Sequence, residues 1–319
     1  MSNEKIKVSV YCAAYNHEKY IAKTLEGFVS QKTDFDFEVI VHDDASTDET
    51  AKVISEYAEK YPDIIKPIYQ TENQYSKKVK IFYEFFMKKM SGQYIAFCEG
   101  DDFWCDENKL QMQADFLDAN HECIMVSHNT ERISVDGERI DDMVRDMSDG
   151  YLSAEDLIAK GKARNPHFSS LMLRAELARE IKPDFFSLTT GDNAWRMFAL
   201  TRGKLYYINR IMSCYRVGTP GSWNSRMKSD PEKYSAYVEG VVRFFEEYDK
   251  YTEGAYHEVI SEEINKRKYT MYMSREDYKA AYEMGKLLKL GIKKRVLLWL
   301  LAHLKFVQKI YKSRKNGKK

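Results

Sequence analysis

The sequence predicts an α/β fold: a mostly parallel sheet flanked by helices, followed by a helical C-terminal region. Strand-like and helix-like stretches alternate over roughly the first hundred of the 319 residues, and the strand-like runs are short and rich in β-branched or aromatic residues. Beyond about Lys228 the apolar residues recur at helical spacing and few helix breakers occur. Alternating strands and helices are typical of parallel sheets covered on both faces.

The first region contains four predicted strands with helices between them. The strands are predicted at Ile6 to Cys12, Phe37 to Val41, Ile64 to Tyr69 and Tyr94 to Cys98. The helices are predicted at Glu18 to Gln31, from Ser46 or Thr47 through Ala58, and at Ile81 to Met90. We expect Ser46 or Thr47 to cap the second helix, because their hydroxyl groups accept hydrogen bonds from unpaired N–H groups at a helix start.

The middle third has shorter apolar runs and more polar connections. Strands are predicted at Ile124 to His128 and Ile133 to Val135, and Asp136-Gly137 is a turn signal. A polar loop is then predicted at Asp141 to Gly150. Another apolar run follows at Ser169 to Leu173, and a helix is predicted from about Ala175.

Two clusters of carboxylates stand where predicted strands end. One lies in Glu38 to Asp48 and the other in Tyr94 to Trp104. Carboxylates crowded at the end of a buried strand repel one another unless a cation shares the site, and a divalent metal is the usual cation for oxygen ligands beside phosphates. In open α/β sheets, ligands bind at the carboxyl ends of the strands. A phosphorylated, nucleotide-activated substrate is therefore the leading hypothesis.

Composition and missing motifs exclude several classes of protein. The five cysteines have no paired metal-ligand spacing and are odd in number, which favours buried thiols in a reducing cytosol. The first residues lack the apolar stretch of a signal peptide, and no window reaches the roughly 20 apolar residues of a membrane span. The GxGxxG motif of dinucleotide-binding folds and the GxxxxGK[ST] motif of P-loop enzymes are absent.

Charge is divided unevenly along the chain. The segment Gly285 to Lys319 holds ten Lys and two Arg with no Asp or Glu, whereas the other residues hold 38 basic and 49 acidic side chains. Apolar residues such as Leu297, Trp299 and Phe306 lie among these cations. We expect an interfacial helix on an anionic membrane surface. The alternative is a terminal helix packed on the rest of the protein with a solvated basic end.

Three ordered motifs closely resemble those of the family 2 glycosyltransferases of the GT-A fold. They are the strand ending in a Tyr-Asn turn at Val8 to Asn16, the DDASTDET segment within His42 to Thr50, and Phe97 to Trp104, where Glu99-Gly-Asp101 stands at the place of the family's DxD motif. A weaker similarity extends to about Trp223 through Thr190 to Asp192 and Cys214 to Arg216. The resemblance implies a GT-A type, Rossmann-like fold.

The same resemblance implies roles in binding a nucleotide-sugar. Ala13 and Tyr15 would border the nucleotide base, and Asp44 would accept a hydrogen bond from it. Glu99 would face the ribose or an outer-shell water. Glu stands here where the family has the first Asp of the motif.

It also implies the residues that act on the reacting groups. Asp101 would ligate Mn²⁺ or Mg²⁺, Asp192 would be the general base that takes the acceptor hydroxyl proton, and Arg216 would fold over the diphosphate. Taken alone, each acidic motif is also compatible with an ordinary turn. His17 and His42 are expected to be loop histidines, not metal ligands, because no partner spacing accompanies them.

The sequence therefore predicts a metal-dependent, inverting glycosyltransferase that moves a hexosyl or N-acetylhexosaminyl group from a nucleotide-sugar, expected to be a UDP-sugar, to a hydroxyl of a glycan or lipid-linked oligosaccharide. The expected domains are a nucleotide-sugar half at 1–125, an acceptor half at 126–227 and a helical region at 228–319. We expect the protein to be located in the cytoplasm, with peripheral attachment to the inner face of the cell membrane. Its expected setting is polysaccharide biosynthesis, and no nucleic-acid partner is expected.

Two alternatives remain open from the sequence. A nucleotidyltransferase uses a similar sheet but usually carries a Gly-rich, basic loop after the first strand, which Cys12 to Asn16 does not offer. A non-catalytic protein that binds a nucleotide-sugar or a carbohydrate would use the same pocket without turnover.

Overall fold

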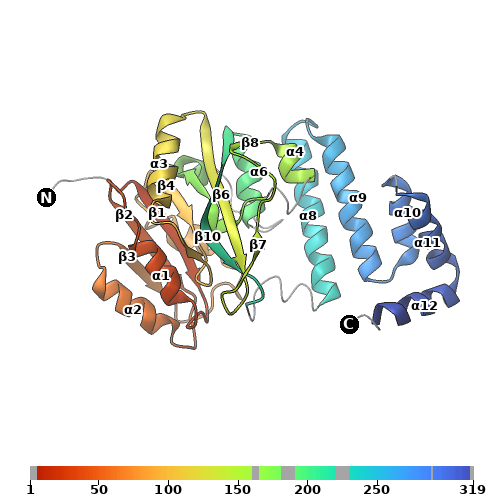
Figure 1. Ribbon diagram of the computed structural model, residues 1–319, viewed down its shortest axis with the longest axis horizontal. Coiled ribbons are helices and arrows are strands. Elements are labelled where there is room, and N and C mark those ends of the chain that lie inside the picture. The colour runs from red at the N-terminus through yellow and green to blue at the C-terminus, as the bar shows by residue number, and fades with distance from the viewer. Residues whose placement is uncertain (1–5, 160–164, 181–190, 220–229, 289, 317–319) are drawn as a thin grey trace. The chain divides into compact units, whose positions relative to one another are not determined.

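The computed structural model describes residues 6–159, 165–180, 191–219, 230–288 and 290–316. The chain forms two compact units, Met1–Pro220 and Gly221–Lys319 (Figure 1). The first unit contains the sheet and all three motifs, and the second is helical. The boundary expected between residues 125 and 126 stays a prediction.

The described residues of the first unit form a ten-stranded sheet. Its main path runs β3-β2-β1-β4-β9-β6-β10-β5, with β7 paired to β6 and β8 paired to β10. The longer strands are β1 (Val8–Ala14), β2 (Phe37–Asp43), β3 (Ile65–Tyr69), β4 (Tyr94–Phe97), β6 (Cys123–Ile133) and β10 (Lys204–Arg216). The short strands are β5 (Phe103–Trp104), β7 (Arg139–Asp142), β8 (Gly150–Leu152) and β9 (Met172–Arg174).

The longer strands run parallel wherever they pair with one another. Strand β1 pairs in parallel with β2 and β4, β2 pairs in parallel with β3, and β6 pairs in parallel with β10. Every antiparallel pair involves one of the four short strands. The predicted mostly parallel α/β sheet is thus confirmed.

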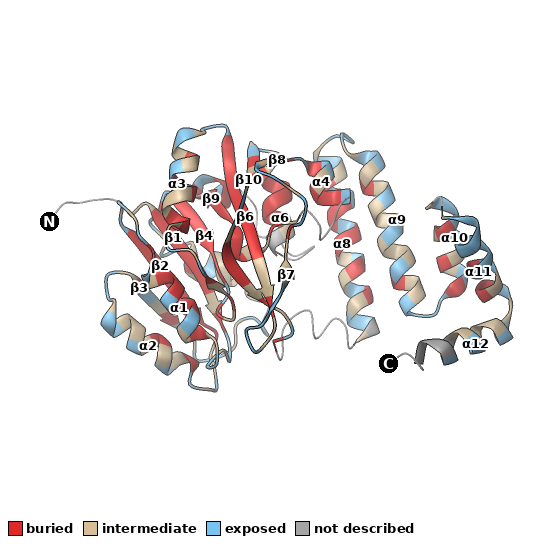
Figure 2. Cartoon of the chain, in the orientation of Figure 1, coloured by how far each residue is buried: buried red, intermediate tan, exposed pale blue. Residues whose placement is uncertain are grey.

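Helices cover both faces of β1 and β2, and nearly all residues of these two strands are buried (Figure 2). Successive side chains of β1 alternate between the two faces. Val8, Val10, Cys12 and Ala14 belong to a core that also contains residues of α1 (Ile21–Val29), α2 (Thr50–Lys60) and α3 (Lys109–Ala119). Tyr11 lies on the other face, with its ring 5.3 Å from those of Phe82 and Phe86. The other helices that the structure describes in this unit are η1 (Phe82–Phe86), α4 (Ala154–Ala159), η3 (Phe168–Ser170), α5 (Ala175–Glu180) and α6 (Gly191–Ala199).

Several predicted boundaries differ from the observed ones. The helix expected at Ile81 to Met90 is a short π-helix, and the two strands expected between Ile124 and Val135 are one strand, β6. The predicted cap of α2 is wrong: the N-cap position is Glu49, with no side-chain cap hydrogen bond. Ser46 instead hydrogen-bonds to Asp43, because the loop after β2 folds back on the end of that strand.

The second unit confirms the predicted helical C-terminal region. Its described helices are α8 (Pro231–Tyr251), α9 (His257–Ser274), α10 (Tyr278–Leu287), α11 (Ile292–His303) and α12 (Lys305–Asn316). The side chain of Asp230 caps α8 by accepting hydrogen bonds from the N–H groups of Glu232 and Lys233. Val238, Val242 and Met271 form a small core between α8 and α9. None of the described helices is both long and apolar enough to cross a bilayer.

Candidate functional site

The candidate site lies at one edge of the sheet, where the parallel strands β1, β2 and β4 end. The Tyr-Asn turn follows β1, the DDASTDET segment begins at the end of β2, and the Glu-Gly-Asp-Asp loop follows β4. Parallel neighbours place their carboxyl ends together, so the fold brings the three sequence motifs to one edge.

The first two motifs are fastened to each other by hydrogen bonds. Asn16 has a positive φ of 55°, and its side-chain oxygen accepts a hydrogen bond from the N–H of Thr47 at 2.8 Å. The N–H of Asn16 donates to the hydroxyl of Ser46, and that of His17 donates to Thr50 Oγ1 at 2.7 Å. The N–H of Glu18 donates to Asp48. The Ser, Thr and Asp residues of the second motif therefore bind the turn after β1.

Both aspartates at the end of β2 are buried and hydrogen-bonded. Asp43 accepts a hydrogen bond from the N–H of Ser46. Asp44 is 3% exposed, and its two carboxylate oxygens accept hydrogen bonds from the N–H groups of Gln74 and Tyr75 at 2.7 and 3.0 Å. Asp44 thus holds the segment after β3 beside the strand ends.

Ala13 and Tyr15 lie at the same edge. Ala13 is half-buried, and its carbonyl accepts a hydrogen bond from the N–H of Gly100 at 2.9 Å. Tyr15 is 44% exposed. A partly open aromatic ring beside a backbone turn is suited to contact a flat, planar ligand.

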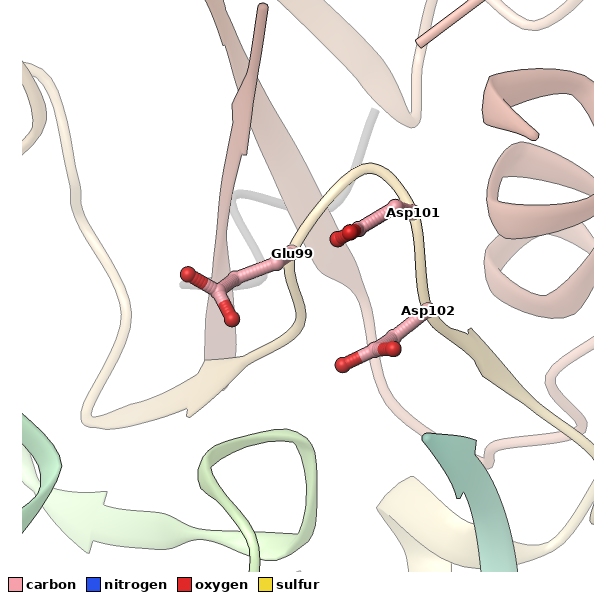
Figure 3. Close-up of side chains that lie close together, drawn as sticks. All are labelled: Glu99, Asp101 and Asp102. Atoms are coloured by element: carbon pink, nitrogen blue, oxygen red, sulfur yellow. The ribbon is translucent and has the colours of Figure 1, made fainter. Parts of the chain in front are cut away.

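Three carboxylates gather in the loop after β4, and we refer to Glu99, Asp101 and Asp102 as the carboxylate cluster. One oxygen from each lies within 4.8 Å of the others, and burial increases from exposed Glu99 to buried Asp102. The three side chains extend to the same side of the loop (Figure 3). Only glycine fits at position 100, because an added Cβ would lie 2.8 Å from His17 Nδ1 and 3.0 Å from the Cβ of Ala14.

Asp102 is the buried member of the cluster, at 1% exposure. Its Oδ1 accepts a hydrogen bond from the N–H of Arg216 at 2.9 Å. Its Oδ2 lies 3.7 Å from His167 Nδ1 and has no hydrogen-bond partner among the described residues. Burial raises the pKa of Asp102 well above its ordinary value, and the charges of Asp101 and Glu99 raise it further. A cation beside this oxygen would relieve both effects.

Side chains from distant segments hold this loop in place. Thr24 is fully buried in α1, and its hydroxyl lies 3.0 and 2.6 Å from the carbonyl oxygens of Gly100 and Asp102. Arg216, at the end of β10, donates to the carbonyl oxygens of Asp101 at 3.2 Å and Val135 at 3.0 Å. Its guanidinium lies 4.7 Å from the centre of the Tyr20 ring, and the residue is only 8% exposed.

The carboxylate cluster fits a divalent cation. It offers several carboxylate oxygens on one side of a loop, including one buried oxygen without a hydrogen-bond partner in the described part of the chain. Hard cations such as Mn²⁺ and Mg²⁺ prefer such oxygen ligands. His17 and His42 are not members of this group. Burial lowers the pKa of both histidines, which favours neutral imidazoles.

Asp192 lies in the first turn of α6, and its side chain is outside the described residues, as are Thr190 and Trp223. The structure brings together Ala13, Tyr15, Asp44, Glu99, Asp101 and Arg216 at or near one sheet edge. The sequence did not predict Thr24 or His167. Thr24 has the appearance of an ordinary helix residue, and no local pattern connects His167 with Asp102.

Comparisons with known proteins agree with this architecture. Residues 9–182, more than half of the chain, match the family model described as "Glycosyl transferase family 2". The protein Rv1520 of Mycobacterium tuberculosis is 39% identical over 132 residues, which are 41% of this chain and 37% of that protein. The chain thus matches little more than a third of the length of this relative.

A second relative is known from both sequence and structure. TarS of Staphylococcus aureus, named a poly(ribitol-phosphate) β-N-acetylglucosaminyltransferase, is 29% identical over 124 residues, 38% of this chain and 20% of that protein. The crystal structure of TarS residues 1–349 in complex with UDP-GlcNAc has a TM-score of 0.61 at 17% identity, covering 98% of this chain and 92% of that one.

A further solved structure shares the fold. The mannosyltransferase PcManGT of Pyrobaculum calidifontis, crystallised with GDP-Man and Mn²⁺, has a TM-score of 0.54 at 16% identity and covers 96% of this chain and 87% of that one. At these identities the structures establish a common fold only. Together with the family match and the three motifs at one sheet edge, they lead to one conclusion: the chain belongs to glycosyl transferase family 2.

Proposed function

We propose that this protein is a metal-dependent, inverting glycosyltransferase that moves a hexosyl or N-acetylhexosaminyl group from a nucleotide-sugar, with a UDP-sugar as the expected donor. The observation that carries the proposal is the carboxylate cluster at the sheet edge of a family 2 fold. TarS, which was crystallised with UDP-GlcNAc, and PcManGT, which was crystallised with GDP-Man and Mn²⁺, support the donor class and the metal.

Asp101 is the proposed metal ligand, and Glu99 is proposed to face the ribose or an outer-shell water. Asp101 is half-buried and Glu99 is exposed, so both side chains are accessible to a ligand. Bound Mn²⁺ or Mg²⁺ would neutralise the charge that develops on the departing diphosphate. Asp102 is proposed to hold the loop in position through its hydrogen bond with the Arg216 N–H.

The nucleotide base is proposed to lie against Ala13 and Tyr15, with Asp44 as its hydrogen-bond acceptor. Each carboxylate oxygen has two lone pairs, so Asp44 keeps acceptor capacity beyond the N–H groups of Gln74 and Tyr75. The hydrogen bonds from these two N–H groups would also fix the orientation in which the carboxylate accepts a hydrogen bond from the base.

Arg216 is proposed to act at the diphosphate through charge and position. Its guanidinium is engaged by the carbonyl oxygens of Asp101 and Val135. It therefore places a permanent positive charge beside the metal-binding loop and holds the backbone of Asp101 there.

Asp192 is the proposed general base. The acceptor hydroxyl oxygen attacks the anomeric carbon while the bond from that carbon to the diphosphate oxygen breaks. The hydroxyl proton passes to Asp192, and the nucleoside diphosphate leaves. One direct displacement inverts the anomeric configuration.

The acceptor is proposed to be a glycan or a lipid-linked oligosaccharide in bacterial surface-polysaccharide synthesis, with residues 1–125 contacting the donor and residues 126–227 the acceptor. The name of TarS, which describes transfer to a polymer, supports this acceptor class. Peripheral attachment to the inner membrane face is proposed separately, on the charge and exposure of the second unit.

A panel of nucleotide-sugars tests the activity. The full chain is incubated with each donor in Mn²⁺ or in a chelator, and release of the free nucleoside diphosphate is measured with and without glycan acceptors. We expect Mn²⁺-dependent release for a UDP-sugar. If the donor stabilises the protein against melting but no donor is ever consumed, the chain is a non-catalytic binding protein and the proposal fails.

A further inference from the structure

Exposed apolar side chains are concentrated in one part of the second unit. Among the described residues, seven of the thirteen exposed large apolar side chains lie between Leu287 and Ile310. Large exposed apolar patches usually mark a surface that contacts another molecule. This surface is remote in sequence from every residue of the proposed transfer reaction, and the inference below does not depend on that reaction.

On α11 the exposed apolar residues form a stripe. Ile292, Val296 and Trp299 are 79%, 52% and 45% exposed and stand at positions i, i+4 and i+7, which places them on one face of the helix. The geometry of an α-helix places Lys293 on one side of this stripe and Arg295 on the other. Both cations are exposed.

The residues that α11 buries lie outside this stripe. The buried residues of α11 are Leu298, Leu301 and Ala302, which occupy a different face of the helix. That face contacts α10 closely, since a Cβ added to Gly285 would lie 2.9 Å from Leu298 Cδ1. The helix is therefore held by one apolar face and leaves a second one exposed to solvent.

The next helix repeats the pattern. Phe306 and Ile310 are 62% and 52% exposed and lie one turn apart on α12. Lys305 and Lys309 precede them by one position each and are exposed along one side of this pair. The expected single interfacial helix is thus two helices, with the break at Leu304.

In the described part of the chain, the cations around both stripes form no ion pair with a carboxylate. The basic segment, Gly285–Lys319, carries twelve cations and no carboxylate side chain. Within the part of the chain that the structure describes, its recorded ion pair is Lys286 with Glu283. The cations beside the stripes, Lys293, Arg295, Lys305 and Lys309, form no ion pair with the described residues.

We propose that the exposed faces of α11 and α12 form a docking surface for an anionic lipid bilayer. Apolar stripes bordered by cations match an interface in which hydrocarbon lies beneath a layer of negative headgroups. The other residues carry a balance of −11 and are repelled by such a surface, so the basic segment supplies the attraction. The helices lie in the plane of the headgroups and do not cross the membrane.

Vesicle binding tests the proposal with the full chain. The protein is sedimented with phosphatidylcholine vesicles and with vesicles containing phosphatidylglycerol, at low and at physiological salt. We expect binding to the anionic vesicles only, and weaker binding at higher salt, because exposed charges are screened over ~8 Å at physiological ionic strength. Trp299 emission should shift to the blue as its ring enters the interface, and Trp299→Phe should remove that shift.

Two sets of substitutions locate the surface. Replacing Ile292, Val296 and Trp299 by Ser, or Lys293 and Arg295 by Gln, should each lower anionic-vesicle binding by about tenfold or more. The matched control replaces Ile140 and Tyr151, two residues of the first unit that are each 49% exposed, by Ser and should bind like the parent. Circular dichroism verifies that all variants are folded, as expected for exposed positions.

Three outcomes would overturn the proposal. The first is no binding to anionic vesicles, or equal binding to neutral and anionic vesicles. The second is a serine triple variant that binds like the parent. The third is a parent protein that self-associates in the absence of lipid and a serine variant that is monomeric, which would make the stripe an interface between copies of the chain.

Discussion

The carboxylates at the sheet edge and the cations of the basic segment are both clusters of like charge, but they are held in different ways. Asp44 and Asp102 are buried, and each accepts at least one backbone hydrogen bond. Lys293, Lys294 and Arg295 extend into solvent on one helical turn. One cluster is fixed by the fold, and the other is free to move.

The difference in burial and hydrogen bonding indicates what each cluster is suited to bind. Buried like charges are costly, so the protein holds them with hydrogen bonds and leaves a site of defined geometry that a small cation and one ligand can fill. Exposed cations on long flexible side chains keep their hydration and adapt to many positions of a partner. The buried carboxylates are therefore suited to binding one ligand in a defined geometry, and the exposed cations are suited to binding an extended anionic surface.

The largest expected effect is on the transfer rate, and it separates donor binding from the chemical step of the proposed reaction. Asp192→Asn should lower the transfer rate by about 10²–10⁴, because a positioned base contributes roughly that factor. Donor affinity should be unchanged, as measured by calorimetry beside single-turnover rates. Near-normal turnover would transfer the role of base to another residue, with Asp102 as the next candidate.

An intermediate effect tests whether the fold really fixes the carboxylate cluster. Thr24→Val removes the hydroxyl that lies beside the carbonyl oxygens of Gly100 and Asp102. We expect a loss of about 10–100-fold in Mn²⁺ affinity or activity, as for other groups that orient metal ligands. Ser30→Ala is the control, because among the described residues the Ser30 hydroxyl donates its hydrogen bond to the Gly27 carbonyl near the end of the same helix. Equal behaviour of the two variants would mean that Thr24 does not position the loop.

A further prediction contrasts the exposed cations with a buried one. Lys109 is fully buried, 3.9 Å from the centre of the Trp104 ring, and burial lowers its pKa from 10.5 to about 7. Between about pH 7 and pH 10 the unfolded chain therefore holds a proton that the folded protein does not, and stability increases with pH across this window.

Lys109→Met removes that proton linkage. The free energy of unfolding of the parent, minus that of the variant, should increase between pH 7 and pH 10 and change little below pH 7. Urea unfolding of both proteins at four pH values measures this difference. A difference that is flat with pH, or that decreases, would show that Lys109 stays charged in the fold.

The sequence predicted the parts of the site that short segments encode. The strand ends predicted at Val41 and Cys98 are marked by an abrupt change from apolar residues to carboxylates, and the structure ends β2 at Asp43 and β4 at Phe97. The order of the strands then determines that these ends meet. Neither step needs information about distant side chains.

What the sequence did not predict depends on contacts between distant segments. Thr24 approaches Gly100 across 76 positions, and Arg216 approaches Asp102 across 114. The cap predicted at Ser46 was wrong for the same reason, because its hydroxyl is engaged by Asp43 and by the N–H of Asn16. A local propensity gives no sign of such competition.

Metal-dependent donor binding tests the central claim, that the carboxylate cluster holds a divalent cation for a nucleotide-sugar. Calorimetric titrations of UDP and a UDP-sugar, with and without Mn²⁺, are made on the parent, on Asp101→Asn and on Asp115→Asn, an exposed carboxylate of α3 that serves as the control. We expect Mn²⁺ to strengthen binding for the parent and the control, and that gain to vanish for Asp101→Asn with the fold intact. If Asp101→Asn binds UDP and Mn²⁺ as well as the parent does, the account is contradicted.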